Sequence, residues 1–199
     1  MSQIETRKET VVQLILPKDL IDLGPHLNNP LFFLAGPIRG GGDWQRLMCI
    51  ILKQLVPDCI IAAPMRWDAS HFLYKYRMQV EGAESFDRQL TWEQHYLETA
   101  AQMHPRGCII FWLGCQKELR TDSDPYAMDT RGELGEWRGR MIYRPLLRVV
   151  VGAEEGFPGL SQIKRNFDAA LGCDFPVYRT MEETAKAAVE ISARRVKPQ

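Results

Sequence analysis

The sequence lacks several features that would place it in a class at once. Its 25 lysine and arginine residues are balanced by 25 aspartate and glutamate residues, so no overall charge draws the chain to nucleic acid or an anionic membrane. No apolar run approaches the roughly 18 residues of a membrane-spanning helix. The charged N-terminus lacks the apolar segment of a signal peptide. We therefore expect a soluble cytoplasmic protein that binds neither a nucleic-acid polymer nor a membrane.

Cysteine is scarce, and its spacing suits neither a disulfide framework nor a zinc site. The five cysteines are odd in number and include no C-x-x-C pair, and most lie in apolar stretches. Free cysteine is among the most buried residue types, so we expect core thiols in a reducing compartment. The four histidines show no metal-ligand or triad spacing. We expect neither a metal ion nor a cofactor.

Internal repeats, low-complexity tracts and interdomain linkers are also missing. With 199 residues, of which 45% are hydrophobic, the chain is long enough for one domain with its own core. We expect an N-terminal extension over residues 1–30 and a single domain over 31–199. The apolar stretch 11–16 before Pro17 indicates an edge strand or an ordered part of that extension.

Apolar strand patterns alternate with helical patterns along the rest of the chain. Strands are expected at 31–35, 59–63, 108–113, 146–151 and 176–178. Helices are expected from about 43, over 88–103, around Glu133, over 160–171, and from Thr180 with a capping box. This alternation predicts a doubly wound α/β fold, flavodoxin- or Rossmann-like, with a mostly parallel sheet and helices on both faces. Ligands of such sheets bind beyond the carboxyl ends of the strands.

Two loops follow the first two of these strands. Residues 36–42 form a glycine-rich loop with one cation, Arg39, between a strand and a helix, where backbone amides could hold a phosphate or a sugar. The loop matches neither a Walker A motif nor a G-x-G-x-x-G fingerprint, and an ordinary strand-to-helix turn is the alternative. The loop 64–68 brings Arg66 and Trp67 to the same edge. The irregular aromatic segment 71–87 is long enough to be a lid.

The third candidate segment is 131–137, in which Glu133 stands between Gly132 and Gly135. A glycine inside a helix costs about 1 kcal/mol relative to alanine, so the pair suggests that something approaches the backbone there. We take Glu133 as the reacting group. The alternative is structural, because Thr130 and Glu133 have the spacing of a capping box.

Taken together, these segments resemble the nucleoside 2-deoxyribosyltransferase-like superfamily, which includes nucleotide N-glycosidases. The resemblance covers residues 31–152 and rests on three segments in order: F-L-A-G-P-I with D-W-Q, then P-M-R-W-D, then G-E-L-G. The pairs Trp92-Glu93, Phe111-Trp112 and Glu136-Trp137 are similar to one branch of the superfamily.

The resemblance assigns roles to particular side chains. It implies that Glu133 is the nucleophile and Glu93 a second acid, although the segment from Glu93 to Cys108 is longer than usual. Where many members have serine, this chain has Pro37. The stretch 38–41 resembles the phosphate-holding loop of nucleotide hydrolases. A free nucleoside and a 5′-nucleotide therefore both remain possible substrates.

Cleavage of an N-glycosidic bond requires a nucleophile for C1′ and a proton for the departing base, and two carboxylates can divide these tasks. We expect Glu133 to attack, and Asp129 or Glu93 to orient the sugar or relay a proton. Gly132 would admit the sugar. The expected substrate-binding residues are Gly36, Pro37, Ile38, Arg39, Gly40, Asp43, Trp44, Arg66, Trp67, Asp68 and Gly132.

Several of these residues also have a purely structural interpretation. Trp44 falls on the apolar face of its helix, where Leu47, Ile51 and Leu55 also lie, and would then belong to the core. Asp129 could cap its helix, and Glu93 could be a solvated helix residue.

The expected function is cleavage or transfer at the N-glycosidic bond of a nucleoside or nucleotide. Two alternatives stay open. One is a nucleotide-binding sensor module without catalysis. The other is an NAD-type glycohydrolase, favoured if the segment 71–87 forms a wide pocket. By analogy with the family, we expect a homo-oligomer.

Overall fold

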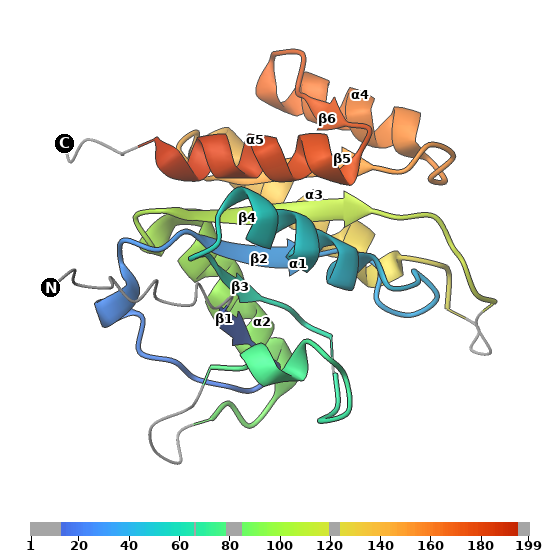
Figure 1. The fold of residues 1–199 in the computed structure, drawn as a ribbon. Coiled ribbons are helices and arrows are strands. Elements are labelled where there is room, and N and C mark those ends of the chain that lie inside the picture. The colour runs from blue at the N-terminus through green and yellow to red at the C-terminus, as the bar shows by residue number, and fades with distance from the viewer. Residues whose placement is uncertain (1–12, 66, 79–84, 120–123, 195–199) are drawn as a thin grey trace, which may run out of the picture.

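The computed structural model describes residues 13–65, 67–78, 85–119 and 124–194. Within these ranges six strands form one sheet, in the order β1-β3-β2-β4-β5-β6, and all neighbouring strands run parallel (Figure 1). The strands are β1 (Gln13–Ile15), β2 (Leu31–Ala35), β3 (Ile60–Ala62), β4 (Gly107–Leu113), β5 (Val149–Ala153) and β6 (Val177–Tyr178).

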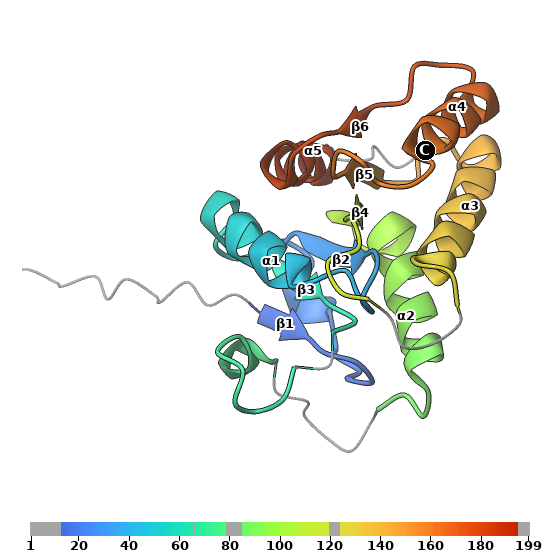
Figure 2. The same cartoon turned by 90° about the vertical axis from the view of Figure 1, so that its right-hand side faces the viewer.

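Helices cover both faces of this sheet, as Figure 2 shows. On one face α1 and α5 pack side by side, and on the other lie α2, α3 and α4. The helices are α1 (Trp44–Leu55), α2 (Gln89–Glu98), α3 (Met128–Tyr143), α4 (Leu160–Leu171) and α5 (Met181–Ala193). The expected doubly wound α/β fold is confirmed, and its sheet is wholly parallel.

The core lies in two layers, one on each side of the sheet. Every residue of β2 and β4 is buried, as expected of strands covered on both faces. Because successive side chains of a strand point to opposite faces, Phe33 and Phe111 pack with α2 while Phe32 and Ile110 pack toward α1 and α5.

The N-terminal segment contributes to the sheet. β1 pairs with β3 at the edge, with Gln13 opposite Ile60 and Ile15 opposite Ala62. Leu14 and Ile15 are completely buried. The expected edge strand is therefore confirmed at residues 13–15. The expected boundary at residue 30 falls inside the sheet, between β1 and β2.

Several element boundaries differ from those expected. The helix expected over 88–103 is α-helical only to Glu98, and Thr99–Met103 continue it as a π-helix. β5 begins at Val149 instead of Leu146, which follows Pro145 and is 65% exposed. The capping box at the start of α5 is confirmed, because Thr180 and Glu183 exchange the expected hydrogen bonds.

The described cysteines are free, as expected. Cys49, Cys59 and Cys108 are buried, whereas Cys115 is half-buried and Cys173 is exposed. Burial raises the pKa of Cys59 and Cys108 to about 12. These buried thiols are therefore protonated core side chains.

Candidate functional site

The site lies at the point where the order of the strands reverses. β2 has β3 on one side and β4 on the other, so the connections from these strands diverge and leave a crevice beyond their carboxyl ends. A cavity of about 570 Å³ occupies this place. It is lined by β2 and the loop that follows (36–39), by 64–65 after β3, by 89–90 and Glu93 of α2, and by 127–130 and Glu133 of α3. We call it the acidic cavity, after Glu93, Asp129 and Glu133.

The start of α3 places two of the three carboxylates in this cavity. Ala127 precedes the helix in the left-handed conformation, with φ of 58°, and the helix begins at Met128 without a side-chain cap. The alternative interpretation of Thr130 and Glu133 as a capping box is therefore wrong, because the helix begins before both residues. Thr130 is buried in the first turn and Glu133 lies in the second, facing the cavity.

Glu133 is half-buried, and its surroundings change its acidity. Burial, together with the nearby negative charges of Glu93, Asp129 and Glu136, raises the pKa of the Glu133 carboxyl to about 7. Near neutral pH this group is thus divided between its protonated and ionised forms. Carboxyl groups tuned in this way are concentrated at functional sites.

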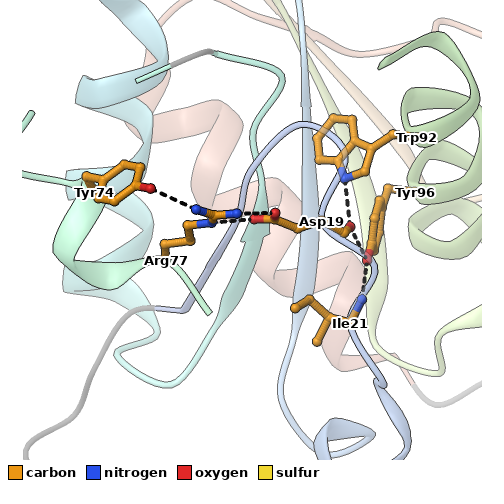
Figure 3. A network of polar contacts seen from close by, with 6 residues as sticks. All are labelled: Asp19, Ile21, Tyr74, Arg77, Trp92 and Tyr96. Atoms are coloured by element: carbon orange, nitrogen blue, oxygen red, sulfur yellow. Dashed lines mark hydrogen bonds and ion pairs between the residues drawn. The ribbon is translucent and has the colours of Figure 1, made fainter. Parts of the chain in front are cut away.

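Glu93 is held by its neighbours on α2. The side-chain amide of Gln89, one turn earlier, donates hydrogen bonds to Glu93 Oε1 at 2.8 Å and to the Pro64 carbonyl oxygen at 3.2 Å. The adjacent Trp92 is completely buried, and its Nε1 donates to the carbonyl oxygen of Asp19 at 3.1 Å (Figure 3). α2 is therefore anchored through Trp92, and Glu93 reaches the cavity from a fixed position.

Asp129 completes the set of three carboxylates. It is exposed and lies in the first turn of α3, where the positive end of the helix dipole favours a negative charge. The structure thus brings the three expected acids, which come from two helices, to the wall of one cavity.

The glycine-rich loop reaches the same cavity through residues 36–39. Gly36 is required there, because its φ is 156° and an added Cβ would lie 2.4 Å from the Trp112 carbonyl oxygen and 2.7 Å from Trp44 Cζ2. Trp44 is 3% exposed and its Nε1 donates to the Pro37 carbonyl oxygen at 2.7 Å. Trp44 therefore belongs to the core and packs against the loop from the side of the core. Its ring is not placed to stack on the base of a nucleoside substrate.

Other expected residues lie outside the acidic cavity. Gly40 does not line it, and its carbonyl oxygen accepts from the Lys117 amide. Asp43 is exposed and pairs with Arg46. Asp68 is exposed, and hydrogen bonds from Ser70 lower its pKa. Gly132 is exposed and has open space where a Cβ would lie, but on a side of α3 that does not line the cavity.

The remaining two expected residues belong to the loop after β3. Trp67 is 8% exposed and stacks on His71, with ring centroids 5.0 Å apart and an angle of 2° between the planes. It lines a neighbouring cavity instead of the acidic one. Arg66 lies outside the described residues.

Gln89, Met65 and Leu90 line the acidic cavity but are not among the expected site residues. Met65 lies within the loop 64–68, so its closeness in sequence to Trp67 could have identified it as a site residue. For Gln89 the only signal is its spacing of four residues from Glu93, which places both on one face of a helix.

No three His, Cys, Asp or Glu side chains in the described part of the chain are grouped so that they could hold a metal ion. The same residues contain no helix that is long and apolar enough to cross a membrane. Comparisons with protein-family models and with curated proteins find no match to this chain. The fold and the cavity together define a class: a doubly wound α/β protein with three carboxylates lining a pocket at its switch point.

Proposed function

We propose that the protein cleaves the N-glycosidic bond of a nucleoside or nucleotide, or transfers its sugar, with Glu133 as the nucleophile. The observation that carries this proposal is the position of Glu133, which is half-buried beside two further carboxylates in a cavity of about 570 Å³. Cavities of this size commonly bind small molecules. The resemblance of residues 31–152 to the nucleoside 2-deoxyribosyltransferase-like superfamily supports the same assignment.

In the first step, the ionised carboxylate of Glu133 attacks C1′ of the sugar. A bond forms between C1′ and the carboxylate oxygen, and the bond to the base nitrogen breaks with its electron pair leaving on the base. The departing base takes up a proton. In the second step, water or another base attacks C1′, the glycosyl–Glu133 bond breaks with its electron pair returning to the carboxylate, and the attacking group releases its proton to solvent.

The two neighbouring acids support different parts of this reaction. The hydrogen bond from Gln89 fixes the position of the Glu93 carboxyl group, which suits it to orient the hydroxyl groups of the sugar. Asp129 is exposed in the first turn of α3, so it is suited to relay a proton to the base. Arg39 and the backbone of residues 36–39 hold the 5′-hydroxyl or 5′-phosphate.

The direct test compares the wild-type protein with Glu133→Gln on a panel of nucleosides, 5′-nucleotides and NAD, with chromatography to detect free base. We expect the wild type to release base and the variant to be slower by at least about a thousandfold, because the nucleophile is lost. Glu136→Gln is a matched control, because Glu136 is exposed on the same helix and does not line the acidic cavity.

Two results would contradict the proposal. Near-normal turnover by Glu133→Gln would remove Glu133 as the nucleophile. Tight ligand retention by the wild type, with no free base over hours, would favour the sensor module, which uses the same cavity for binding alone.

A further inference from the structure

A second cavity, of about 350 Å³, adjoins the acidic cavity. The two share Met65 and Gln89 as a common wall. The other walls of the second cavity come from residues 16–18 after β1, from Trp67, and from Tyr74 and Arg77. We call it the basic cavity, after Lys18 and Arg77. No part of the mechanism described above uses it.

The two cavities differ in the sign of their charge. Among the described residues, three carboxylates and one arginine line the acidic cavity, whereas two cations and no carboxylate line the basic cavity. Arg77 donates to both carboxylate oxygens of the buried Asp19, at 2.8 and 2.5 Å, and to the Tyr74 hydroxyl at 2.7 Å (Figure 3). Asp19 thus neutralises Arg77 and fixes its position.

Lys18 supplies the second cation of the basic cavity. It is exposed, and its ammonium group makes no hydrogen bond or ion pair with the described residues. Its backbone has φ of 75°, and Lys18 and Ala127 are the only non-glycine residues with positive φ in the described part of the chain. Each of them lines one of the two cavities. Unfavourable backbone conformations of this kind are concentrated at ligand sites.

Trp67 adds a hydrogen-bond donor without an acceptor. Its side chain is buried, yet its indole Nε1 has no hydrogen-bond partner among the described residues. A buried donor of this kind is stabilised by an acceptor on a ligand. Trp67 and Tyr74 also give the basic cavity two aromatic side chains.

We propose that the basic cavity binds a phosphate-bearing aromatic group, so that the two adjoining cavities together accept a dinucleotide. The inference rests on the proposed function, which places the sugar of the scissile bond in the acidic cavity. Arg39 holds the phosphate of the nucleotide that carries the scissile bond, whereas Lys18 attracts the second phosphate on the other side of the Met65–Gln89 wall. The Trp67 indole donates to a phosphate or ring acceptor, and the ring of the second nucleotide packs against Tyr74.

The test is a binding measurement by calorimetry with NAD, AMP and adenosine. All proteins carry Glu133→Gln, so that the ligands stay intact. We expect NAD to bind at least about tenfold more tightly than AMP, because it alone fills both cavities. Adding Lys18→Ala should weaken NAD binding about fivefold and leave AMP binding unchanged, since one partly exposed ion pair is lost. Met65→Trp places a larger side chain between the two cavities. Adding it should block a ligand that spans both cavities and so remove the preference for NAD.

Lys75→Ala is the matched control, because Lys75 is exposed in the same segment as Tyr74 and does not line the basic cavity. Thermal unfolding verifies that each variant is folded. Equal binding of NAD and AMP would overturn the inference, as would equal effects of Lys18→Ala and Lys75→Ala. Equal weakening of AMP and NAD by Lys18→Ala would also overturn it, because the cavity would then hold the phosphate of a mononucleotide.

These outcomes are separate from the failure of the proposed function, because the binding measurement needs no turnover. A Lys18-dependent preference for NAD in the proteins that carry Glu133→Gln, together with no release of base by the wild type, would sustain the dinucleotide site and contradict the N-glycosidase.

Discussion

The side chain of Gln89 links Glu93 to the loop after β3, because its amide nitrogen lies 2.8 Å from Glu93 Oε1 and 3.2 Å from the Pro64 carbonyl oxygen. Two walls of the acidic cavity are thereby joined by one side chain, which also forms part of the wall shared with the basic cavity. Gln89 therefore acts as a positioning residue, through Glu93, in the proposed reaction.

Replacing Gln89 with leucine should lower kcat/KM for base release about tenfold, because one charge-assisted hydrogen bond to Glu93 is lost. The effect should fall mainly on kcat, since the sugar is oriented less well. Steady-state kinetics measures both constants. Gln94→Leu, at an exposed position on the same helix that does not line the acidic cavity, is the control and should behave as wild type. Equal kinetics for the two variants would exclude this role of Gln89.

The activity should depend on the ionisation of Glu133. Because the nucleophile is the ionised carboxylate, and burial and neighbouring acids raise its pKa to about 7, kcat/KM should rise with pH through about 7 and level off above it. Glu93→Gln removes one neighbouring negative charge, which lowers this pKa and moves the rising limb to lower pH. A pH–rate profile measures the limb. If the rising limb of the profile lies at the same pH in Glu93→Gln as in the wild type, a group other than Glu133 controls it.

Glu133 should also lower the stability of the fold. Its pKa is raised from 4.5 in the unfolded chain to about 7 in the folded protein, so the folded state binds the proton more tightly. The stability that this provides is fully present below about pH 4.5 and is lost as the pH rises through about 7. Relative to the protonated form, ionised Glu133 therefore destabilises the fold at alkaline pH.

Glu133→Gln removes this penalty and should stabilise the protein by about 1–2 kcal/mol at pH 8, a figure reduced for the partial exposure of the side chain. At pH 4 the gain should be close to zero. Urea unfolding at the two pH values measures the difference. A variant that is less stable than wild type at pH 8, or equally stabilised at both pH values, would contradict the assigned electrostatics.

Gly36, which lines the acidic cavity, and Gly132, on another side of α3, should respond to alanine in opposite directions. Gly36→Ala should destabilise the protein by about 3 kcal/mol, because the new Cβ would meet the Trp112 carbonyl oxygen at 2.4 Å in an unfavourable backbone conformation. Gly132→Ala should stabilise it by up to about 1 kcal/mol, since the position is helical with nothing within 4 Å of the new Cβ. Denaturant unfolding measures both. The reverse order would contradict the described packing.

Much of the fold could be predicted because local patterns agree with the tertiary structure. β2 and α4 have the bounds expected from the sequence. For β2 the reason is that a strand buried on both faces is a continuous apolar run. The buried face of α1 was predicted less well. Leu47 and Leu55 were expected on it but are 44% and 38% exposed, whereas Met48 and Leu52 are completely buried. This helix has more apolar residues than its core face can hold.

The start of α3 could not be predicted from its own residues. The spacing of Thr130 and Glu133 imitates a capping box, but the helix starts earlier. The loop before it is held by a contact that is distant in sequence, in which the Tyr126 hydroxyl donates to the Gly114 carbonyl oxygen at 2.8 Å. A local motif carries no information about such a contact.

The acidic cavity was accessible from the sequence because the glycines beside Glu133 and the family resemblance indicated its carboxylates, and because the loops after β2 and β3 meet at one edge of a parallel sheet. The basic cavity was not. Arg77 reaches its position by pairing with Asp19, which is 58 residues away in the sequence. Neither residue belongs to a recognisable motif, so this part of the molecule is visible only in three dimensions.

A glycosyl–enzyme intermediate on Glu133 can be detected directly by mass spectrometry of the intact protein incubated with a nucleoside fluorinated at C2′. Fluorine at C2′ disfavours the positively charged transition state by which the intermediate breaks down, so a glycosyl–enzyme bond accumulates. We expect a mass increase of one fluorinated sugar, located at Glu133 and absent from Glu133→Gln. Release of the base without any adduct, or with an adduct at a different residue, would contradict it.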